Sequence, residues 1–388
     1  MSRFYTNVVK YGNNLLLRYV NNGQDFKSKV QYRPTLFVPK KDGDSDWHTL
    51  EGGAVSPVKF ESIKEASEYV ERYKDVEGFN FYGQTQFQYQ YITETYNKTI
   101  NWDKDKIKLF SIDIETATEN GFPDIKEANE EILLITIKDN NHKQIVTFGS
   151  KPFMTDRPDV KYIQCTDESN LLRMFVTFWS NNYPDVVTGW NINSFDIPYI
   201  VNRIRLMLGD DYVKRLSPWN VVNDKKAYVG GGTTIQSYAF LGISILDYLD
   251  LYKKFTYTNQ ESYKLDYIAS VELGEKKLEN PYDNFKDFYT KDWLKFVKYN
   301  IHDVELADKL EDKMKLIELV YTLAYSSKIN YEDVFSPVRM WDCIIFNYLY
   351  ERNIAIPLKE EANVKSEMFE GAYVKDPLVG PQIGRAHV

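Results

Sequence analysis

The chain has 388 residues and a net charge of −8, with 43% hydrophobic and 27% charged residues. That length is enough for two or three domains, each with its own core. The negative charge excludes a protein held to nucleic acid by a broad basic field, so any such contact must be local or mediated by metal ions. Cys165 and Cys343 match no metal-binding spacing, and no apolar run could span a membrane. Met1 opens no secretory signal, so a reduced, cytosolic protein is the default expectation.

Residues 1–103 are predicted to be rich in strands. Alternating runs such as FYTNVV and NLLLRYV are followed by Asn22-Gly23, which is typical of a hairpin turn. One helix is predicted over residues 62–75, with Ser62 as its N-cap. No pattern of a catalytic site occurs in this part of the chain.

From residue 104 strands alternate with helices, which is typical of an α/β domain with a mixed sheet. Strands are predicted over residues 108–116, 130–139, 143–148 and 185–190. Helices are predicted over residues 167–182, 195–208 and 291–320. Glycines between strand-like runs predict a protruding hairpin near residues 222–240. The rest, residues 331–382, is expected to hold one helix at about 338–351 and extended pieces.

The long helix at 291–320 is predicted from one continuous apolar stripe. Its predicted buried residues are Leu294, Val297, Ile301, Val304, Ala307, Leu310, Met314 and Ile317.

Two carboxylates stand one residue apart in the apolar strand FSIDIET. Alternate strand residues share a face, so Asp113 and Glu115 would lie side by side, opposite Ile112 and Ile114. Close like charges repel each other, and burying them costs more still. A divalent cation is the simplest way to stabilise such a pair. The alternative is an edge strand with an exposed polar face, which the flanking apolar residues disfavour.

Further acids follow in two other segments. Asp196 stands where a strand gives way to a helix, a place where α/β sheets put their sites. Its alternative role is helix capping, which Ser194 is expected to perform instead. Tyr299 and Asp303 are four residues apart and share a helix face. A solvated polar face is the alternative explanation for that pair taken alone.

The combination favours a metal site. Asp113, Glu115, Asp196 and Asp303 could together hold two divalent ions about 3.5–4 Å apart, an arrangement that supports in-line attack on a phosphodiester. Tyr299 would orient the attacking water through its hydroxyl. His302 points away from Asp303 on the same helix, so we exclude it as a base.

These segments resemble the exonuclease motifs of family B DNA polymerases, and within them the replicative polymerases of T-even bacteriophages. SIDIET is similar to the first motif, NINSFDIPY to the second and YNIHDVEL to the third. The tyrosine four residues before the last aspartate is typical of the DEDD subclass that uses tyrosine. VQYRPTLFVP, YITETYN, SILDYLDLYKKFTYTN and FSPVRMWDCIIFN extend the resemblance over nearly residues 1–382.

The resemblance implies an RNase H-like exonuclease domain with a mixed sheet at residues 104–330. A strand-rich α+β N-terminal domain would comprise residues 1–103, completed by 331–382. The implied activity is removal of 3′-terminal nucleotides from single-stranded DNA with two Mg²⁺ ions, for which Mn²⁺ can substitute. The hairpin near 222–240 would help to separate primer from template. Phe122 matches a position that stacks on the unpaired strand, and its alternative is a loop side chain tucked into the core.

The resemblance also implies a longer natural protein. FEGAYVKDP leads into the palm in this family, and no SLYPS or DTDS motif of a polymerase active site follows here. The ending IGRAHV, residues 383–388, continues no earlier pattern and is expected to be a non-native tail. Implied partners are single-stranded and primer–template DNA, and for the full-length protein a sliding clamp, a single-strand-binding protein and its own messenger RNA. The implied location is the cytoplasm of an infected bacterial host, without membrane contact.

The sequence leaves two alternative functions open. One is nucleic-acid binding without catalysis through the N-terminal domain, which lacks a dense basic stripe. The other is a free-standing exonuclease that uses the same acids. The additional N-terminal domain and the abrupt ending disfavour it.

Overall fold

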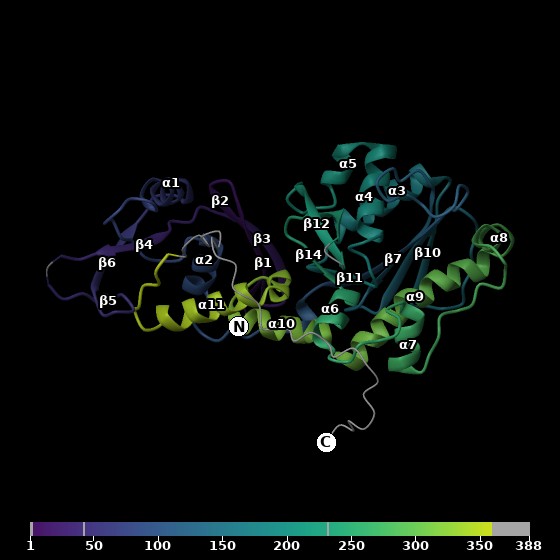
Figure 1. Cartoon of the computed structure of the whole chain (residues 1–388). Helices are drawn as coiled ribbons and strands as arrows, with labels where there is room; N and C mark the ends of the chain where they lie inside the picture. Colours follow the sequence, from purple (N-terminus) through teal and green to yellow (C-terminus); the bar gives the residue numbers. More distant parts are fainter. Residues whose placement is uncertain (1–2, 42, 231–232, 359–388) are drawn as a thin grey trace, which may run out of the picture.

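A computed structural model describes residues 3–41, 43–230 and 233–358. Two halves lie side by side, a strand-rich N-terminal half and a larger α/β half (Figure 1). The predicted tail at 383–388 and the extended pieces beyond residue 358 lie outside the described residues.

The N-terminal half contains two small antiparallel sheets, as its alternating sequence predicted. The first comprises β1 (Arg3–Tyr11), β2 (Asn14–Asn21) and β3 (Gln24–Val30), and the second comprises β4 (Thr35–Pro39), β6 (Ala54–Lys59) and β5 (Trp47–His48). Asn22 and Gly23 both have positive φ angles and turn the chain between β2 and β3, which confirms the predicted hairpin.

Two helices accompany these sheets. The predicted helix is α1 (Ile63–Tyr73), and the Ser62 hydroxyl accepts a hydrogen bond from the Glu65 amide, which confirms the N-cap. The sequence analysis missed α2 (Phe87–Thr95), whose buried residues include polar as well as aromatic side chains. A helix buried on several sides shows no apolar stripe, so its periodicity gives little signal.

The larger half is built on a six-stranded sheet of the predicted mixed type. Its strands are β7 (Leu109–Thr116), β8 (Ile132–Asp139), β9 (Gln144–Gly149), β10 (Val160–Gln164), β11 (Val186–Gly189) and β14 (Ser244–Asp247). The spatial order is β10-β9-β8-β7-β11-β14. Only β8 runs antiparallel to its neighbours. The short strands β10 and β14 were missed.

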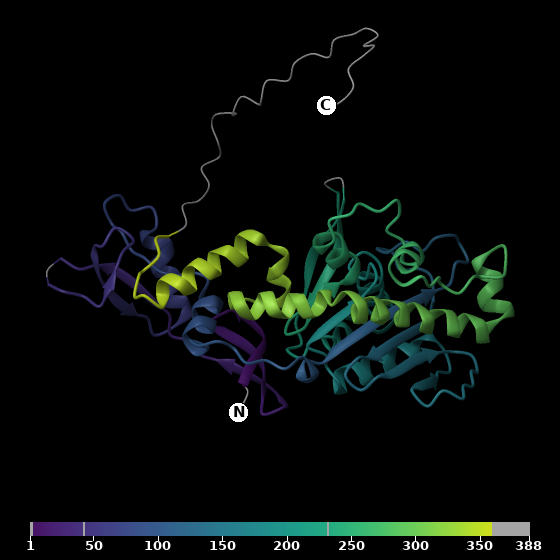
Figure 2. The same ribbon diagram turned by 90° about the horizontal axis from the view of Figure 1, so that it is seen from below.

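Helices cover both faces of this sheet. On one face α3 (Glu168–Asn181) and α4 (Asp196–Leu208) pack on the strands, and on the other face lie α8 (Phe285–Lys291) and α9 (Trp293–Met314). Three shorter helices complete this half: α5 (Asp210–Lys214), α6 (Tyr248–Phe255) and α7 (Leu265–Leu273). The predicted hairpin consists of β12 (Val222–Gly230) and β13 (Thr233–Phe240), which pair antiparallel and project from the sheet region (Figure 2).

The prediction of one long helix over residues 291–320 is wrong. Two helices occupy this region, α9 and α10 (Leu316–Ser327), because Lys315 between them is left-handed with a φ of 58°. The Glu311 side chain accepts hydrogen bonds from the Ile317 and Glu318 amides and so caps the start of α10. No glycine or proline near residue 315 indicates this break in the sequence.

The predicted stripe is also wrong at its first position. Leu294 is 50% exposed, because α9 begins at Trp293 and turns that side of its first turn to solvent. Met314 is half-buried, and the other predicted positions are buried.

One hydrophobic core joins the two halves. It includes side chains from β1 and α2 together with Leu306 and Leu310 of α9, the face of α10 that includes Tyr321, and Cys343 of the predicted helix α11 (Pro337–Tyr350). Short 3-10 turns, η1 (Lys104–Lys106) and η2 (Tyr331–Phe335), connect the halves. The division at residues 103 and 330 stays a prediction. Within the described ranges, no helix combines the length and apolarity that crossing a membrane requires.

Candidate metal centre

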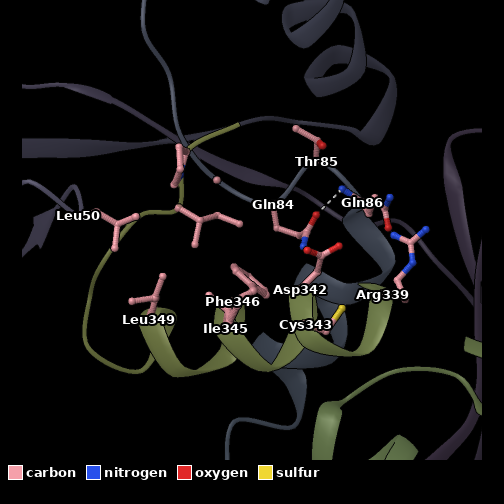
Figure 3. Close-up of a pocket in the computed structure, with 13 residues that line it drawn as sticks. Leu50, Gln84, Thr85, Gln86, Arg339, Asp342, Cys343, Ile345, Phe346 and Leu349 are labelled. Atoms are coloured by element: carbon pink, nitrogen blue, oxygen red, sulfur yellow. Dashed lines mark hydrogen bonds between the residues drawn. The ribbon is translucent and has the colours of Figure 1, made fainter. Parts of the chain in front are cut away.

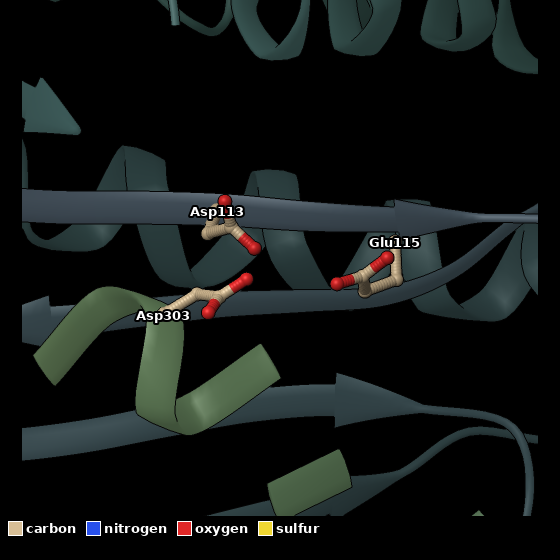
Figure 4. Close-up of side chains that lie close together, drawn as sticks. All are labelled: Asp113, Glu115 and Asp303. Atoms are coloured by element: carbon tan, nitrogen blue, oxygen red, sulfur yellow. The ribbon is translucent and has the colours of Figure 1, made fainter. Parts of the chain in front are cut away.

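The first two predicted acids lie on β7, which is an inner strand between β8 and β11. Ile112 and Ile114 are buried in the core beneath α3 and α4. Asp113 and Glu115 therefore project from the opposite face, towards α9 (Figure 4). The alternative of an exposed edge strand does not hold, because both sides of β7 are paired.

A third carboxylate approaches this pair from α9. One oxygen each of Asp113, Glu115 and Asp303 lie within 4.8 Å of one another (Figure 4). The Oδ1 atom of Asp303 is buried and has no hydrogen-bond partner within the described residues. A buried, unpaired carboxylate oxygen beside two further carboxylates fits the ligand set of a hard divalent cation.

Asp196 lies beside this group without converging as closely. It is the first residue of α4, is 4% exposed, and its Oδ1 accepts a hydrogen bond of 3.0 Å from the Ile114 amide of β7. It lines the same cavity as Asp113 and Asp303. The expectation that Ser194 caps the helix is wrong, because Phe195 occupies the N-cap position and no side chain accepts a capping hydrogen bond there.

Tyr299 shares the predicted helix face with Asp303. It is half-buried and packs edge-on against Phe288, so the solvated-face alternative is excluded for this pair. Burial raises the pKa of its phenol to about 12, so the hydroxyl keeps its proton at neutral pH. His302 is not among the residues that line the acid cavity.

The sequence analysis missed two residues that are candidates for a functional role. Lys277 forms an ion pair with Asp303 and lies over the Tyr299 ring, with its Nζ 4.8 Å from the ring centroid. Asn300 is fully buried, and its Nδ2 donates a 2.6 Å hydrogen bond to Asp113. Asn300 stands three residues before Asp303, so helical spacing could have revealed it. Lys277 lies in a loop and carries no periodic signal.

Burial raises the pKa of every acid in the group, and repulsion from other acids of the group adds to it for Asp113, Glu115 and Asp196. Burial and the neighbours Asp196, Asp303 and Glu115 raise the pKa of Asp113 well above its usual value. Burial raises the pKa of Glu115 to about 8 and that of Asp196 to about 7. Burial raises the pKa of Asp303 to about 6, against the opposing effect of Lys277. A divalent cation would remove this electrostatic cost.

Three of these four acids line a cavity of about 820 Å³, called here the acid cavity. It is lined by Asp113, Asp196 and Asp303 and, on its rim, by Trp190 and Phe122. Phe122 is 85% exposed, with its ring 5.8 Å from that of Phe195. The alternative that Phe122 is tucked into the core is therefore wrong.

A second cavity, of about 220 Å³, lies in the N-terminal half between α11 and residues 83–86 (Figure 3). Its lining is mainly apolar, with Arg339 and Asp342 at one end. None of the predicted site residues lines it, so it is not a candidate for the same chemistry.

In this α/β half, carboxylates from an inner strand of a mixed sheet and from two helices line one cavity. Comparisons with known proteins indicate the family to which such a domain belongs. Residues 61–268 match the family model described as DNA polymerase family B, exonuclease domain, and this match covers more than half of the chain. The chain therefore belongs to the family B DNA polymerases and contains their RNase H-like exonuclease domain.

Relatives support the predicted resemblance to T-even phage polymerases. The chain is 32% identical over 407 residues to the DNA-directed DNA polymerase of Escherichia phage RB69, and 33% identical over 404 residues to that of Enterobacteria phage T4. Each alignment covers 97% of this chain and 44% of the phage protein, so the chain spans less than half the length of these relatives. The DNA polymerase catalytic subunit of Elephantid herpesvirus 1 is 25% identical over 72% of this chain and 28% of that protein.

Proposed function

We propose that this chain carries the proofreading 3′–5′ exonuclease of a replicative DNA polymerase of the phage type. It would remove nucleotides from single-stranded DNA ends and release deoxynucleoside 5′-monophosphates. The observation that supports this most directly is the convergence of Asp113, Glu115 and Asp303 from β7 and α9 in a chain that belongs to the family B DNA polymerases. A non-catalytic binding module does not explain the acid cluster, and a free-standing exonuclease does not explain alignments with phage DNA polymerases over 97% of the chain.

The four acids would hold two divalent cations, Mg²⁺ by preference with Mn²⁺ able to substitute. When bound, these ions would supply charge neutralisation for the attacking and leaving oxygens. Asp113, Glu115 and Asp303 offer oxygens close enough to share one ion, and Asp196 offers its oxygens from the start of α4. The ligand roles of all four are part of this proposal.

The other side chains would position the reacting groups. Tyr299, protonated at neutral pH, would orient the attacking water with its hydroxyl. The water oxygen forms a bond to phosphorus while the bond to the 3′ oxygen breaks, and the shortened strand leaves with that oxygen protonated. Asn300 would hold the Asp113 carboxylate in place, and Phe122 would stack on a base near the cavity rim.

Several finer points belong to the same proposal. The β12–β13 hairpin would help to separate primer from template, and residues 1–103 with 331–382 would form the N-terminal domain. Single-stranded and primer–template DNA are the proposed substrates. The sliding clamp, the single-strand-binding protein, the messenger RNA and the location in the host cytoplasm stay predictions.

The test is degradation of a 5′-labelled single-stranded oligonucleotide with Mg²⁺. The double variant Asp113→Ala/Glu115→Ala should lose activity by a factor of at least about 1,000, because two of the three acids whose oxygens converge on one proposed ion site are removed. The matched control is Asp75→Ala/Glu77→Ala, an exposed pair with the same spacing and charge. Equal rates for the parental chain and the first variant would refute the proposal.

A further inference from the structure

A third cavity, of about 630 Å³, lies between the base of β12, α6 and η2. Four lysines line it in a chain whose net charge is −8. They are Lys225 and Lys226 of β12 and Lys253 and Lys254 of α6. We call this cavity the lysine groove.

Two of these lysines are engaged by neighbours. Lys225 forms an ion pair of 3.2 Å with Glu332, whose other carboxylate oxygen accepts a hydrogen bond from the Ile245 amide. Lys254 donates a hydrogen bond of 3.2 Å to the carbonyl oxygen of Phe335. These contacts join β12 and α6 to η2. The groove is therefore held in shape by specific contacts and is more than a cluster of charged residues.

The other two lysines remain exposed. Within the described part of the chain, Lys226 and Lys253 form no hydrogen bond and no ion pair, and Lys253 lies 5.1 Å from the ring centroid of Tyr263. The acids of the groove are already engaged: Asp333 accepts hydrogen bonds from the Tyr89 hydroxyl and the Asn330 amide, and burial raises the pKa of Asp250. The groove therefore offers two exposed ammonium groups, of which Lys253 also interacts electrostatically with Asp250.

The lysine groove and the acid cavity share a wall. Asn191 and Ser194 line the acid cavity, whereas Asn193 lines the lysine groove. Asp247 accepts hydrogen bonds of 2.9 Å from the Asn191 amide and 2.8 Å from the Asn193 amide, which ties this wall to the end of β14. Tyr263, beneath Lys253, is itself part of the acid-cavity lining. Residues 191–194 therefore contribute to both cavities, so the acid cavity and the lysine groove are neighbours.

The acid cavity and the lysine groove carry groups of opposite charge, so they would act differently on the phosphates of one DNA strand. Those carboxylates of the acid cavity that are ionised repel phosphates when no cation is bound, and Lys264 and Lys277 in the same lining offset part of their charge. Lysine ammonium groups attract phosphates as point charges and do not distinguish bases. Attraction at the lysine groove would offset part of the repulsion and would act on strands of any sequence.

We propose that the lysine groove binds the phosphate backbone of single-stranded DNA whose 3′ end occupies the acid cavity. This inference rests on the proposed function. It predicts that strands long enough to reach the groove bind more tightly than strands that fill the acid cavity alone.

The test measures fluorescence anisotropy in the Asp113→Ala/Glu115→Ala background, so that the DNA stays intact. Lys226→Ala/Lys253→Ala should weaken binding of an oligonucleotide of about 12 nucleotides about tenfold, and should lower the slope of log affinity against log salt by about 1.4. Binding of a trinucleotide should not change. Lys226→Arg/Lys253→Arg should restore the affinity, because it restores both charges.

The matched control removes two exposed lysines elsewhere, Lys161 on β10 at the opposite edge of the sheet and Lys98 in the N-terminal half. This control should leave both affinities unchanged. Unchanged binding of the longer strand by Lys226→Ala/Lys253→Ala, or an equal loss for the trinucleotide, would overturn the inference. Hydrolysis of the trinucleotide by the parental chain tests the proposed function separately.

Discussion

Asn300 and Lys277 show how the candidate site depends on side chains other than the acids. Asn300 donates to Asp113 and accepts from the Thr136 hydroxyl of β8, so it links α9 to two strands at once. Lys277 supplies a positive charge to Asp303 from a loop. Burial alone would lower the pKa of Lys277, but Asp303, Tyr299 and Asp113 raise it above its usual value, so the side chain stays charged.

We expect Lys277→Met to lower the exonuclease rate at least about tenfold, because Asp303 and Tyr299 both lose the cation that positions them. The rate is measured on a single-stranded oligonucleotide with saturating Mg²⁺. Lys276→Met is the control, since the neighbouring Lys276 is exposed and does not line the acid cavity. Similar rates for the two variants would contradict a role for Lys277.

The raised pKa of Glu115 makes the stability of the metal-free chain depend on pH. The pKa is about 8 in the folded chain against 4.5 as the ordinary value, so stability is fully present below about pH 4.5 and is lost as pH rises to about 8. Glu115→Gln removes this titration. With a chelator present, urea denaturation should show the variant more stable than the parent at pH 8, by on the order of 1–3 kcal/mol, and the difference should shrink towards pH 5. A difference that grows towards pH 5 would contradict the assignment.

At the scale of elements, the break between α9 and α10 decides which half of the molecule each helix packs against. A straight helix over 291–320 would carry the second half of the apolar stripe past the sheet. The left-handed Lys315 instead redirects the chain, so that α9 covers the sheet and α10 packs on the N-terminal half. Tyr325 of α10 donates to the Tyr5 carbonyl, and Tyr5 donates to the Ile329 carbonyl.

Lys315→Gly should stabilise the chain by about 0.5–1 kcal/mol, because glycine adopts a positive φ without the steric cost that a side chain brings. Lys298→Gly, at an exposed position in the interior of α9, should destabilise by about 1 kcal/mol, since helix interiors disfavour glycine. Urea denaturation measures both. The same sign for the two substitutions would show that Lys315 is not left-handed in solution.

At the scale of the whole molecule, the two halves share one core and a set of buried hydrogen bonds. The Asn330 side chain accepts from the Val8 amide at 2.8 Å and donates to the Val8 carbonyl at 2.9 Å, so it continues the edge of β1. Buried Arg18 of β2 pairs with Asp185 at 3.0 Å, just before β11. Contacts of this kind make separate unfolding of the halves unfavourable.

We therefore expect the two halves to unfold together, in one cooperative transition measured by calorimetry. Asn330→Ala should lower the midpoint of that single transition by about 2–8 °C, because two backbone groups of Val8 lose their partner. Asn13→Ala removes an exposed hydrogen bond to the Lys64 amide and should change the midpoint less. Two resolved transitions, with only one shifted by Asn330→Ala, would contradict a shared core.

Much of the architecture followed from local patterns. The Asn22-Gly23 turn, the Ser62 cap and the helices α1, α3, α4 and α11 each depend on residues close in sequence, so local rules apply to them. Short strands such as β14, and helices buried on several sides such as α2, carry too little periodicity to be recognised. The break at Lys315 depends on Glu311 and on packing against the other half, and local rules cannot anticipate it.

The sequence by itself determined which side chains of β7 share a face, because strand periodicity holds wherever the strand lies. It also determined that Asp303 and Tyr299 share a helix face, for the corresponding reason. Only the tertiary structure decided that these faces meet, that Lys277 and Asn300 join them, and that Phe122 stands exposed at the rim. Those outcomes depend on contacts between residues far apart in the chain, whose energies appear only once the sheet, α9 and the intervening loops have packed together.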